Sequence, residues 1–440
     1  MIPRVKARMP ALMSGLTVVG ALVLALAVGY FVPDQPLLAL AATVAVLVLG
    51  VSVAQPAVLP ILAMPVVLVV ARLDVAGLEM SISDWAIGLA FWPAVLLGPR
   101  PFSPQLRAML WLGALYQAVT LFTVLANPFG ANVIEWFHAW MIIGGALVVG
   151  WTVGASGHAK LGLSLFLLAA SGLAVATLVQ AAMQYSHGDF SAVYPVWPWP
   201  MHKNFVGTVL AFAALVAYLH PTWMGWTRRA ALTMFWLFAA AVAVSQSRQA
   251  LIALGVALVV VSFRRRGQQP RSVLALTAVG PAVLFVGTLL RDQVAEGNRF
   301  NSWFQRLDWF EESIAAWIEA PLFGHGLRYW TQEGAPTSFQ PPQAVLEVLA
   351  SAGVIGLAGF VVSFAGMAVI LWKLDPEYGT IAFALIFARL IQGQFDLFWV
   401  GGTTTVPFLI AGVALGALRH AEHRTAPAVG PHRFPAGSQR

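Results

Sequence analysis

Long apolar runs follow one another along almost the whole chain, and this pattern constrains the fold more than any other feature. The runs centre near residues 22, 45, 64, 91, 116, 146, 172, 212, 237, 256, 281, 358, 386 and 410. An α-helix rises about 1.5 Å per residue, so about 20 apolar residues cross the hydrocarbon core of a bilayer. The pattern therefore predicts an all-α, polytopic membrane protein with about 12–14 transmembrane helices.

The composition supports this prediction and excludes several chemistries. Only 10% of the residues are charged and 59% are hydrophobic, whereas soluble domains carry about 25% charged residues. Many of the 17 tryptophans lie near the ends of apolar runs, which is where amphipathic rings sit at a membrane interface. The chain has no cysteine, so disulfides, thiolate nucleophiles and cysteine-bound metals are excluded.

The charges are distributed unequally between the two sides of the predicted membrane. If the N-terminus lies inside, most of the 25 lysines and arginines fall inside, and most of the 18 acidic residues fall outside. The positive-inside rule then predicts a multi-pass protein of the inner (plasma) membrane with both termini in the cytoplasm. The basic segment 419–440 is predicted to be a disordered cytoplasmic tail. Because no folded basic surface lies behind these charges, membrane lipids are expected partners and nucleic acid is not.

Two segments interrupt the succession of apolar runs, and both fall outside. They are residues 184–203 and the large extracytoplasmic loop 292–342. Within the second loop, apolar residues recur at helical spacing between positions 300 and 318, which predicts an amphipathic helix lying on the membrane interface. We divide the chain into an N-terminal transmembrane scaffold (1–183), a region bearing both outer loops (184–418) and the tail (419–440).

Three cations outside, against the topological bias, are candidates for binding an anionic substrate. Arg248 lies in Ser-Gln-Ser-Arg-Gln (245–249), Lys203 precedes an apolar run, and Arg306 lies on the predicted interfacial helix. A guanidinium offers a bidentate fork to phosphate oxygens, although a snorkelling arginine at a helix end would look the same.

Arg389 is a further candidate because it lies within an apolar run. It is followed by Gln392, Gln394 and Asp396. A charge at the centre of a bilayer costs about 2.5–3.5 kcal/mol on insertion scales. Arg389 must therefore face a polar cavity or pair internally, and structural pairing and substrate binding both fit.

Soluble-enzyme motifs are absent. The sequence has no P-loop, no His-Glu-x-x-His and no Asp-x-Asp. His325, between two glycines, is either a general base or a loop histidine. The outer histidines do not cluster at ligand spacing, so neither a metal nor another cofactor is expected.

Four pieces between residues 200 and 370 together resemble the O-antigen ligase and O-antigen polymerase superfamily of polyprenyl-diphosphate-glycan transferases. In order, they are Met-His-Lys-Asn-Phe (201–205), Ser-Gln-Ser-Arg-Gln-Ala-Leu-Ile (245–252), Arg306 with Trp309 and Pro-Leu-Phe-Gly-His-Gly (321–326), and the segment from Val345 through Gly353 and Gly356. Their order, spacing and shared outer placement carry the resemblance.

The resemblance implies a membrane glycosyltransferase for cell-envelope polysaccharide assembly. It would move a glycan from a polyprenyl-diphosphate donor to an acceptor hydroxyl, on a glycan or a lipid, outside the cytoplasm and without a metal. Carried over to this chain, Arg248 and Arg306 would bind the diphosphate with help from Lys203.

One position departs from the ligase pattern. Ligases of this superfamily place a histidine eleven residues before the glycine that corresponds to Gly353, and here that position is Pro342. The resemblance therefore leaves His325, Glu347 or His202 as the candidate base. Gln343, which follows Pro342, is a candidate substrate-binding residue.

Two other functions remain open. A multi-span transporter of an anionic or lipid-linked substrate would use Arg389 and the glutamine-rich stretch 386–396 as a polar pathway, although no internal repeat is visible. A non-catalytic scaffold of an envelope assembly would bind partners and tolerate substitution of the arginines.

Overall fold

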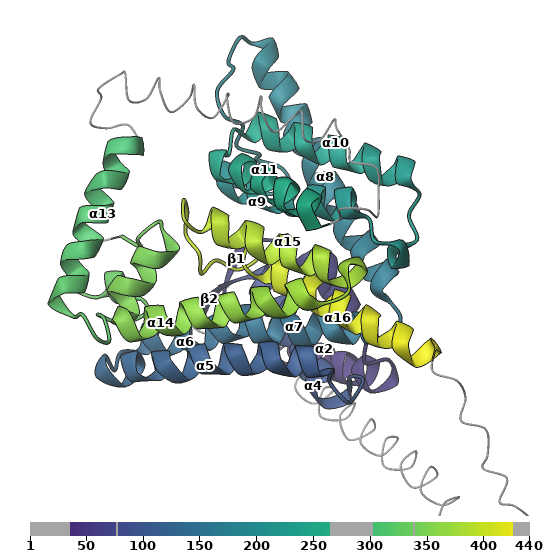
Figure 1. The fold of residues 1–440 in the computed structure, drawn as a ribbon, viewed down its shortest axis with the longest axis horizontal. Helices are drawn as coiled ribbons and strands as arrows, with labels where there is room; N and C mark the ends of the chain where they lie inside the picture. Colours follow the sequence, from purple (N-terminus) through teal and green to yellow (C-terminus); the bar gives the residue numbers. More distant parts are fainter. Residues whose placement is uncertain (1–35, 76–77, 265–301, 338, 426–440) are drawn as a thin grey trace, which may run out of the picture.

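The computed structural model describes residues 36–75, 78–264, 302–337 and 339–425 (Figure 1). In chain order its elements are α2 (Pro36–Ala54), α3 (Val58–Val66), β1 (Arg72–Val75), β2 (Leu78–Ser81), α4 (Ile82–Leu97), α5 (Pro104–Ala126), α6 (Gly130–Trp140), η1 (Met141–Gly145), α7 (Ala146–Ala155), α8 (Ala159–Ser186), α9 (Lys203–Leu219), η2 (Thr222–Met224), α10 (Arg228–Ser245), α11 (Arg248–Arg264), α13 (Ser302–Glu319), η3 (Tyr329–Thr331), α14 (Ala344–Lys373), α15 (Pro376–Gln392) and α16 (Thr405–Thr425).

These elements confirm the predicted all-α fold. The predicted spans near residues 22 and 281 lie outside the described residues, and the other predicted centres all fall inside helices. One feature was not expected: β1 and β2 form a short antiparallel hairpin that pairs Arg72 with Ser81. Helix α16 also continues to Thr425, into the segment predicted to be a disordered tail.

Several described helices meet the dimensions of membrane spans. Five are long and apolar enough to cross a bilayer: Pro104–Ala126, Gly130–Ala155, Ala159–Ser186, Arg228–Ser245 and Ala344–Lys373. The helical segments Val46–Ala54 and Val58–Val66 instead meet at 115°. The runs near 45 and 64 thus form one broken span or a re-entrant pair rather than two full spans. The chain is a polytopic membrane protein, and its full number of spans stays a prediction.

The loops gather at two ends of the bundle. At one end, the indole of Trp226 donates to the hydroxyl of Ser164 (2.9 Å) and the guanidinium of Arg264 donates to the carbonyl of Leu374 (3.0 Å). We call this the basic end, because it carries Arg100, Lys160, Arg228, Arg229, Arg264, Lys373, Arg419 and Arg424. Its assignment to the cytoplasm stays a prediction.

The opposite end carries segments 187–202, 320–343 and 393–404, and we call it the site end. Hydrogen bonds connect these segments with one another and with the helix ends beside them. The amide of Gln246 donates to the carbonyl of Phe190 (2.8 Å), and the amide of Asn127 donates to the carbonyl of Gly324 (3.1 Å). Helices from both predicted divisions of the chain reach this end, since α5 packs against α14 and α7 against α16.

Glycines allow α7 and α16 to pack at backbone contact. A Cβ atom on Gly150 or Gly154 would fall on the carbonyl oxygen of Leu409 or Val413. Gly412 on α16 is equally close to the backbone of α7. Such pairs of small residues four apart are typical of helix packing in membranes, where close backbone approach replaces the hydrophobic effect.

Replacing Gly150 with alanine is expected to destabilise the protein. The added methyl has no space, and overpacking of this kind costs about 1–3 kcal/mol. Thermal unfolding of the detergent-solubilised protein measures the effect. Gly172→Ala is the matched control, because a Cβ atom there meets nothing within 4 Å. Equal melting temperatures for the two variants would contradict the packing described for α7 and α16.

Helix α13 lies crosswise to α14 and α5 at the site end (Figure 1). Its small residues Ser313 and Ala316 are buried, whereas the large apolar side chains of Leu307, Ile314 and Ile318 are exposed. An exposed apolar stripe on a helix across the end of a transmembrane bundle is typical of a helix in the membrane interface. This arrangement fits the predicted interfacial helix.

Candidate functional site

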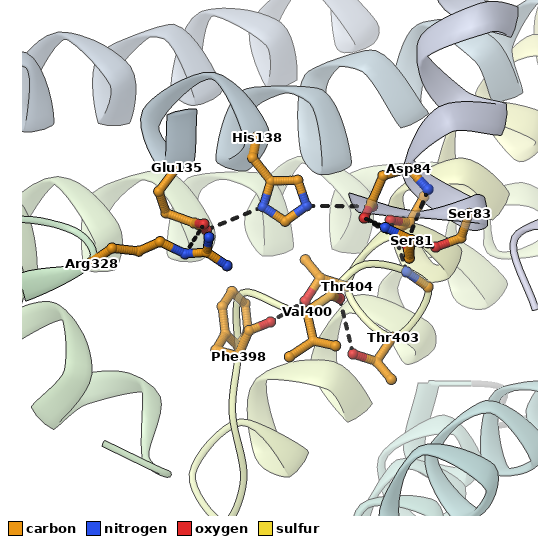
Figure 2. Close-up of polar contacts among 12 residues, drawn as sticks. Ser81, Ser83, Asp84, Glu135, His138, Arg328, Phe398, Val400, Thr403 and Thr404 are labelled. Carbon is orange, nitrogen blue, oxygen red and sulfur yellow. Dashed lines mark hydrogen bonds and ion pairs between the residues drawn. The ribbon is translucent and has the colours of Figure 1, made fainter. Parts of the chain in front are cut away.

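Segment 393–404, between α15 and α16, is the centre of the site end, and Arg389 fixes its shape. The guanidinium of Arg389 donates to the carbonyls of Leu397 (2.7 Å) and Phe398 (2.5 Å) and to the hydroxyl of Thr404 (3.0 Å). Thr404 in turn donates to the carbonyl of Phe398 (Figure 2). These bonds satisfy buried carbonyls that no helix satisfies.

The apolar run suggested that Arg389 lies in the middle of a membrane span. The structure does not place it there. It lies in the last turn of α15, with only 2% of its surface exposed. The apolar run extends past the end of the helix because segment 393–404 contains Phe395, Phe398 and Trp399. Internal pairing, one of the two alternatives for Arg389, is what the geometry supports, and substrate binding by Arg389 stays a prediction.

Side chains of segment 393–404 form hydrogen bonds with residues at the starts of α11 and α14. The amide of Gln249 donates to the carboxylate of Asp396 (2.5 Å), and the amide of Gln343 donates to the side-chain oxygen of Gln394 (2.9 Å). The structure thereby brings Gln343 into one hydrogen-bonded region with the residue that follows Arg248.

Lys203 and Arg248 are the first residues of neighbouring helices, α9 and α11. A Cβ atom on Gly207 would fall on Ser247, so the first turn of α9 packs directly on the turn that precedes α11. The ammonium of Lys203 lies 5.8 Å from the ring centroid of Tyr194. Both cations are half-buried, at helix N-termini where the backbone dipole also favours anions.

Glu347 is buried in the first turn of α14, with 1% of its surface exposed. Its Oε1 atom accepts from the amide of Gln340 (2.6 Å), while its Oε2 atom has no hydrogen-bond partner. The backbone N–H of Phe398 and the charge of Arg389 both interact favourably with this carboxylate. Because an unpartnered buried carboxylate oxygen is costly, its presence suggests a functional role.

The two candidate histidines are engaged with the backbone. The Nε2 atom of His325 lies 2.8 Å from the carbonyl oxygen of Ala316, to which it donates. His202 is the N-cap of α9, and its Nδ1 atom accepts from the backbone N–H of Asn204 (3.3 Å).

The Pro-Leu-Phe-Gly-His-Gly stretch has a structural role at a break in α14. Gly353 has a φ of 64°, so the helix is interrupted there. The stretch pairs with the break: the backbone N–H of His325 donates to Ala350 (3.1 Å), that of Gly326 to Ser351 (2.9 Å), and that of Val354 to Pro321 (2.9 Å). Glycine is required at 353 because of its positive φ and because a Cβ atom would meet the backbone of residues 322 and 323.

The sequence did not reveal that Arg328, one of the weaker candidates among the outer cations, ends a series of ionisable residues that crosses the site end (Figure 2). Arg328 Nε lies 3.0 Å from Glu135 Oε2, Glu135 Oε1 lies 3.2 Å from His138 Nδ1, and His138 Nε2 lies 3.4 Å from Asp84 Oδ1. Asp84 also accepts from the hydroxyl of Ser81 (2.5 Å), the N-cap of α4. A glutamate and a histidine three residues apart inside an apolar run were the available signal.

Arg306 lies on α13, and its side chain is outside the described residues. Within the described ranges, no three histidine, aspartate or glutamate side chains are grouped so as to hold a metal ion. Metal independence stays a prediction.

Residues 233–361 match the family model described as O-antigen ligase. This segment includes Arg248, Arg306, His325, Gln343 and Glu347, whereas Lys203 and segment 393–404 lie beyond it. Comparison with curated proteins gave no match. The match over residues 233–361 supports membership of the O-antigen ligase superfamily and a glycosyltransferase-like ligase role for this multi-pass membrane protein.

Proposed function

We propose that the protein transfers a glycan from a polyprenyl-diphosphate donor to an acceptor hydroxyl on a glycan or a lipid. The reaction takes place at the site end, on the extracytoplasmic face of the inner membrane, and uses no metal. One observation carries the proposal: the first turns of α11 and α14, which carry the family-matched residues Arg248, Gln343 and Glu347, are both bonded to segment 393–404, through Gln249–Asp396 and Gln343–Gln394.

Positively charged side chains stabilise the leaving group of this reaction, which is the diphosphate. The bond between the glycan's anomeric carbon and the diphosphate oxygen breaks, so negative charge develops on the diphosphate. Arg248 and Lys203, at the N-termini of α11 and α9, stabilise that charge in surroundings of low dielectric constant. Arg306, on the crosswise helix α13, is the third proposed diphosphate-binding residue.

Glu347 is the residue best placed to act as the general base in the absence of a histidine at position 342. The acceptor oxygen forms the new bond to the anomeric carbon, and its proton passes to Glu347 Oε2. That atom is unpartnered, whereas His325 and His202 bond the backbone. Gln340 holds the other carboxylate oxygen and thereby fixes its orientation.

The proposal is tested with purified protein in lipid nanodiscs, supplied with a polyprenyl-diphosphate oligosaccharide, candidate acceptors and a chelator. Mass spectrometry follows the glycosylated acceptor and free polyprenyl diphosphate. Equal amounts of both products support the proposal. Donor flux across liposomes without product would favour the transporter, and partner binding without either would favour the scaffold.

Labelling of introduced cysteines is expected to place the site end outside the cell. The chain has no natural cysteine, so Val196→Cys at the site end and Arg229→Cys at the basic end each provide a single exposed thiol. A membrane-impermeant maleimide should label Val196→Cys in intact cells and Arg229→Cys only after the membrane is opened. The reverse pattern would contradict the proposed orientation.

A further inference from the structure

Arg328 is anchored at the site end by its neighbours in the chain. The backbone N–H of Leu327 donates to the side-chain oxygen of Asn132 (2.8 Å), which is fully buried in α6. The amide of Asn127, at the end of α5, donates to the carbonyl of Gly324 (3.1 Å). The backbone before Arg328 is therefore attached to the helices that carry its ion-pair partner.

Asp84, His138, Glu135 and Arg328 form a series in which each ionisable side chain contacts the one before it. Asp84 forms a capping box with Ser81, and its other oxygen contacts His138. His138 contacts one oxygen of Glu135 and Arg328 contacts the other. The side chains of Asp84, His138 and Glu135 are between 6% and 12% exposed, so the chain is largely shielded from solvent and holds its geometry.

The Arg328 guanidinium, at the end of this series of ion pairs, has N–H groups that can still bind an anion. The Arg328 side chain is 37% exposed. Its Nε side faces Glu135, and within the described residues Nη1 and Nη2 form no hydrogen bond. Two parallel N–H groups held at one orientation match the spacing of two phosphate oxygens.

The neighbours of Arg328 connect it with the proposed base. The next residue, Tyr329, is buried, and its phenol accepts from the hydroxyl of Thr337 (3.2 Å). Burial raises the pKa of the Tyr329 phenol, and the charge of Glu347 adds to this rise. Glu135, the partner of Arg328, also interacts electrostatically with Glu347. Both direct neighbours of Arg328, Tyr329 in the sequence and Glu135 in the ion pair, thus interact with Glu347.

We propose that Arg328 is a diphosphate-binding residue of this site, positioned by the ion-pair chain of Glu135, His138 and Asp84. The inference rests on the proposed function, because it assumes a donor with a diphosphate. Glu135, His138 and Asp84 are positioning residues that do not touch the donor.

The test measures binding of farnesyl diphosphate, a short polyprenyl diphosphate, to the purified full-length protein. Arg328→Gln is expected to raise the Kd by about ten- to a hundredfold, as expected for loss of one hydrogen bond to a charged group. Glu135→Gln is expected to raise it less, because the guanidinium remains but loses its orientation. Arg100→Gln, at the basic end, is the matched control and should leave the Kd unchanged.

The outcomes separate this inference from the function on which it rests. If Arg328→Gln lowers the melting temperature but leaves the Kd unchanged, Arg328 only anchors its loop and the inference is wrong. If Arg328→Gln does not fold, Glu135→Gln decides, because it keeps the guanidinium but removes its ion-pair partner: an unchanged Kd for the diphosphate overturns the inference. If the wild-type protein binds no farnesyl diphosphate and shows no transfer, the proposed function itself fails.

Discussion

Arg248→Ala is expected to lower the rate of glycan transfer by about 10²–10³-fold, the usual cost of removing one preorganised group that stabilises transition-state charge. Arg248 begins α11 beside Gln249, whose bond to Asp396 does not involve the guanidinium. The substitution therefore removes a charge from the site and leaves the connection to segment 393–404 in place. The fold should be preserved.

Single-turnover release of polyprenyl diphosphate, with acceptor in excess, measures this effect. Arg100→Ala is the matched control, because it removes an arginine from the basic end and should leave the rate unchanged. Equal rates for Arg248→Ala and wild type, with normal melting temperatures, would remove Arg248 from the proposed machinery.

Glu347→Gln is expected to lower the transfer rate by about 10²–10⁴-fold, the usual contribution of a general acid or base. The substitution keeps the size of the side chain and an oxygen that accepts from Gln340. Because the acceptor for Gln340 remains, the melting temperature should stay close to that of the wild type. Loss of activity without loss of stability would separate a catalytic role from a structural one.

His325→Gln is the comparison that decides between the two candidate bases. A glutamine amide at position 325 can still donate to the carbonyl of Ala316, so the loop should remain in place. Retained transfer in His325→Gln with loss in Glu347→Gln is the expected pair of results. The opposite pair would transfer the role of base to His325.

Much of the fold could be predicted because the bilayer thickness sets the length of an apolar helix that crosses it. The described helices enclose the predicted centres, and basic residues gather at one end as the charge pattern indicated. The bend between α2 and α3 could not be predicted in this way. Apolar content shows that a segment avoids water, but it does not show whether a short helix crosses the membrane or turns back.

Individual site residues could be predicted where a charged side chain lay in an unexpected place in the sequence. Contacts between residues far apart in the sequence could not be predicted. Arg248, Gln343 and Glu347 were candidates from the sequence, and hydrogen bonds to Gln394 and Asp396 now connect their helix ends. The ion-pair chain joins residues 84, 135, 138 and 328, and no local pattern spans such separations. The sequence drew attention to Gln394 and Asp396 but did not show that α15 ends at Gln392 and that a loop follows it.

Locating the donor diphosphate on the protein tests the proposed site most directly. A polyprenyl-diphosphate donor with a photoreactive group next to the diphosphate would be bound in nanodiscs and irradiated, and the labelled peptides would be sequenced. Labels are expected at the site end, in residues 201–206, 245–250, 327–347 and 393–400. Labels confined to the basic end, in residues 221–229 or 371–379, would contradict the proposed site.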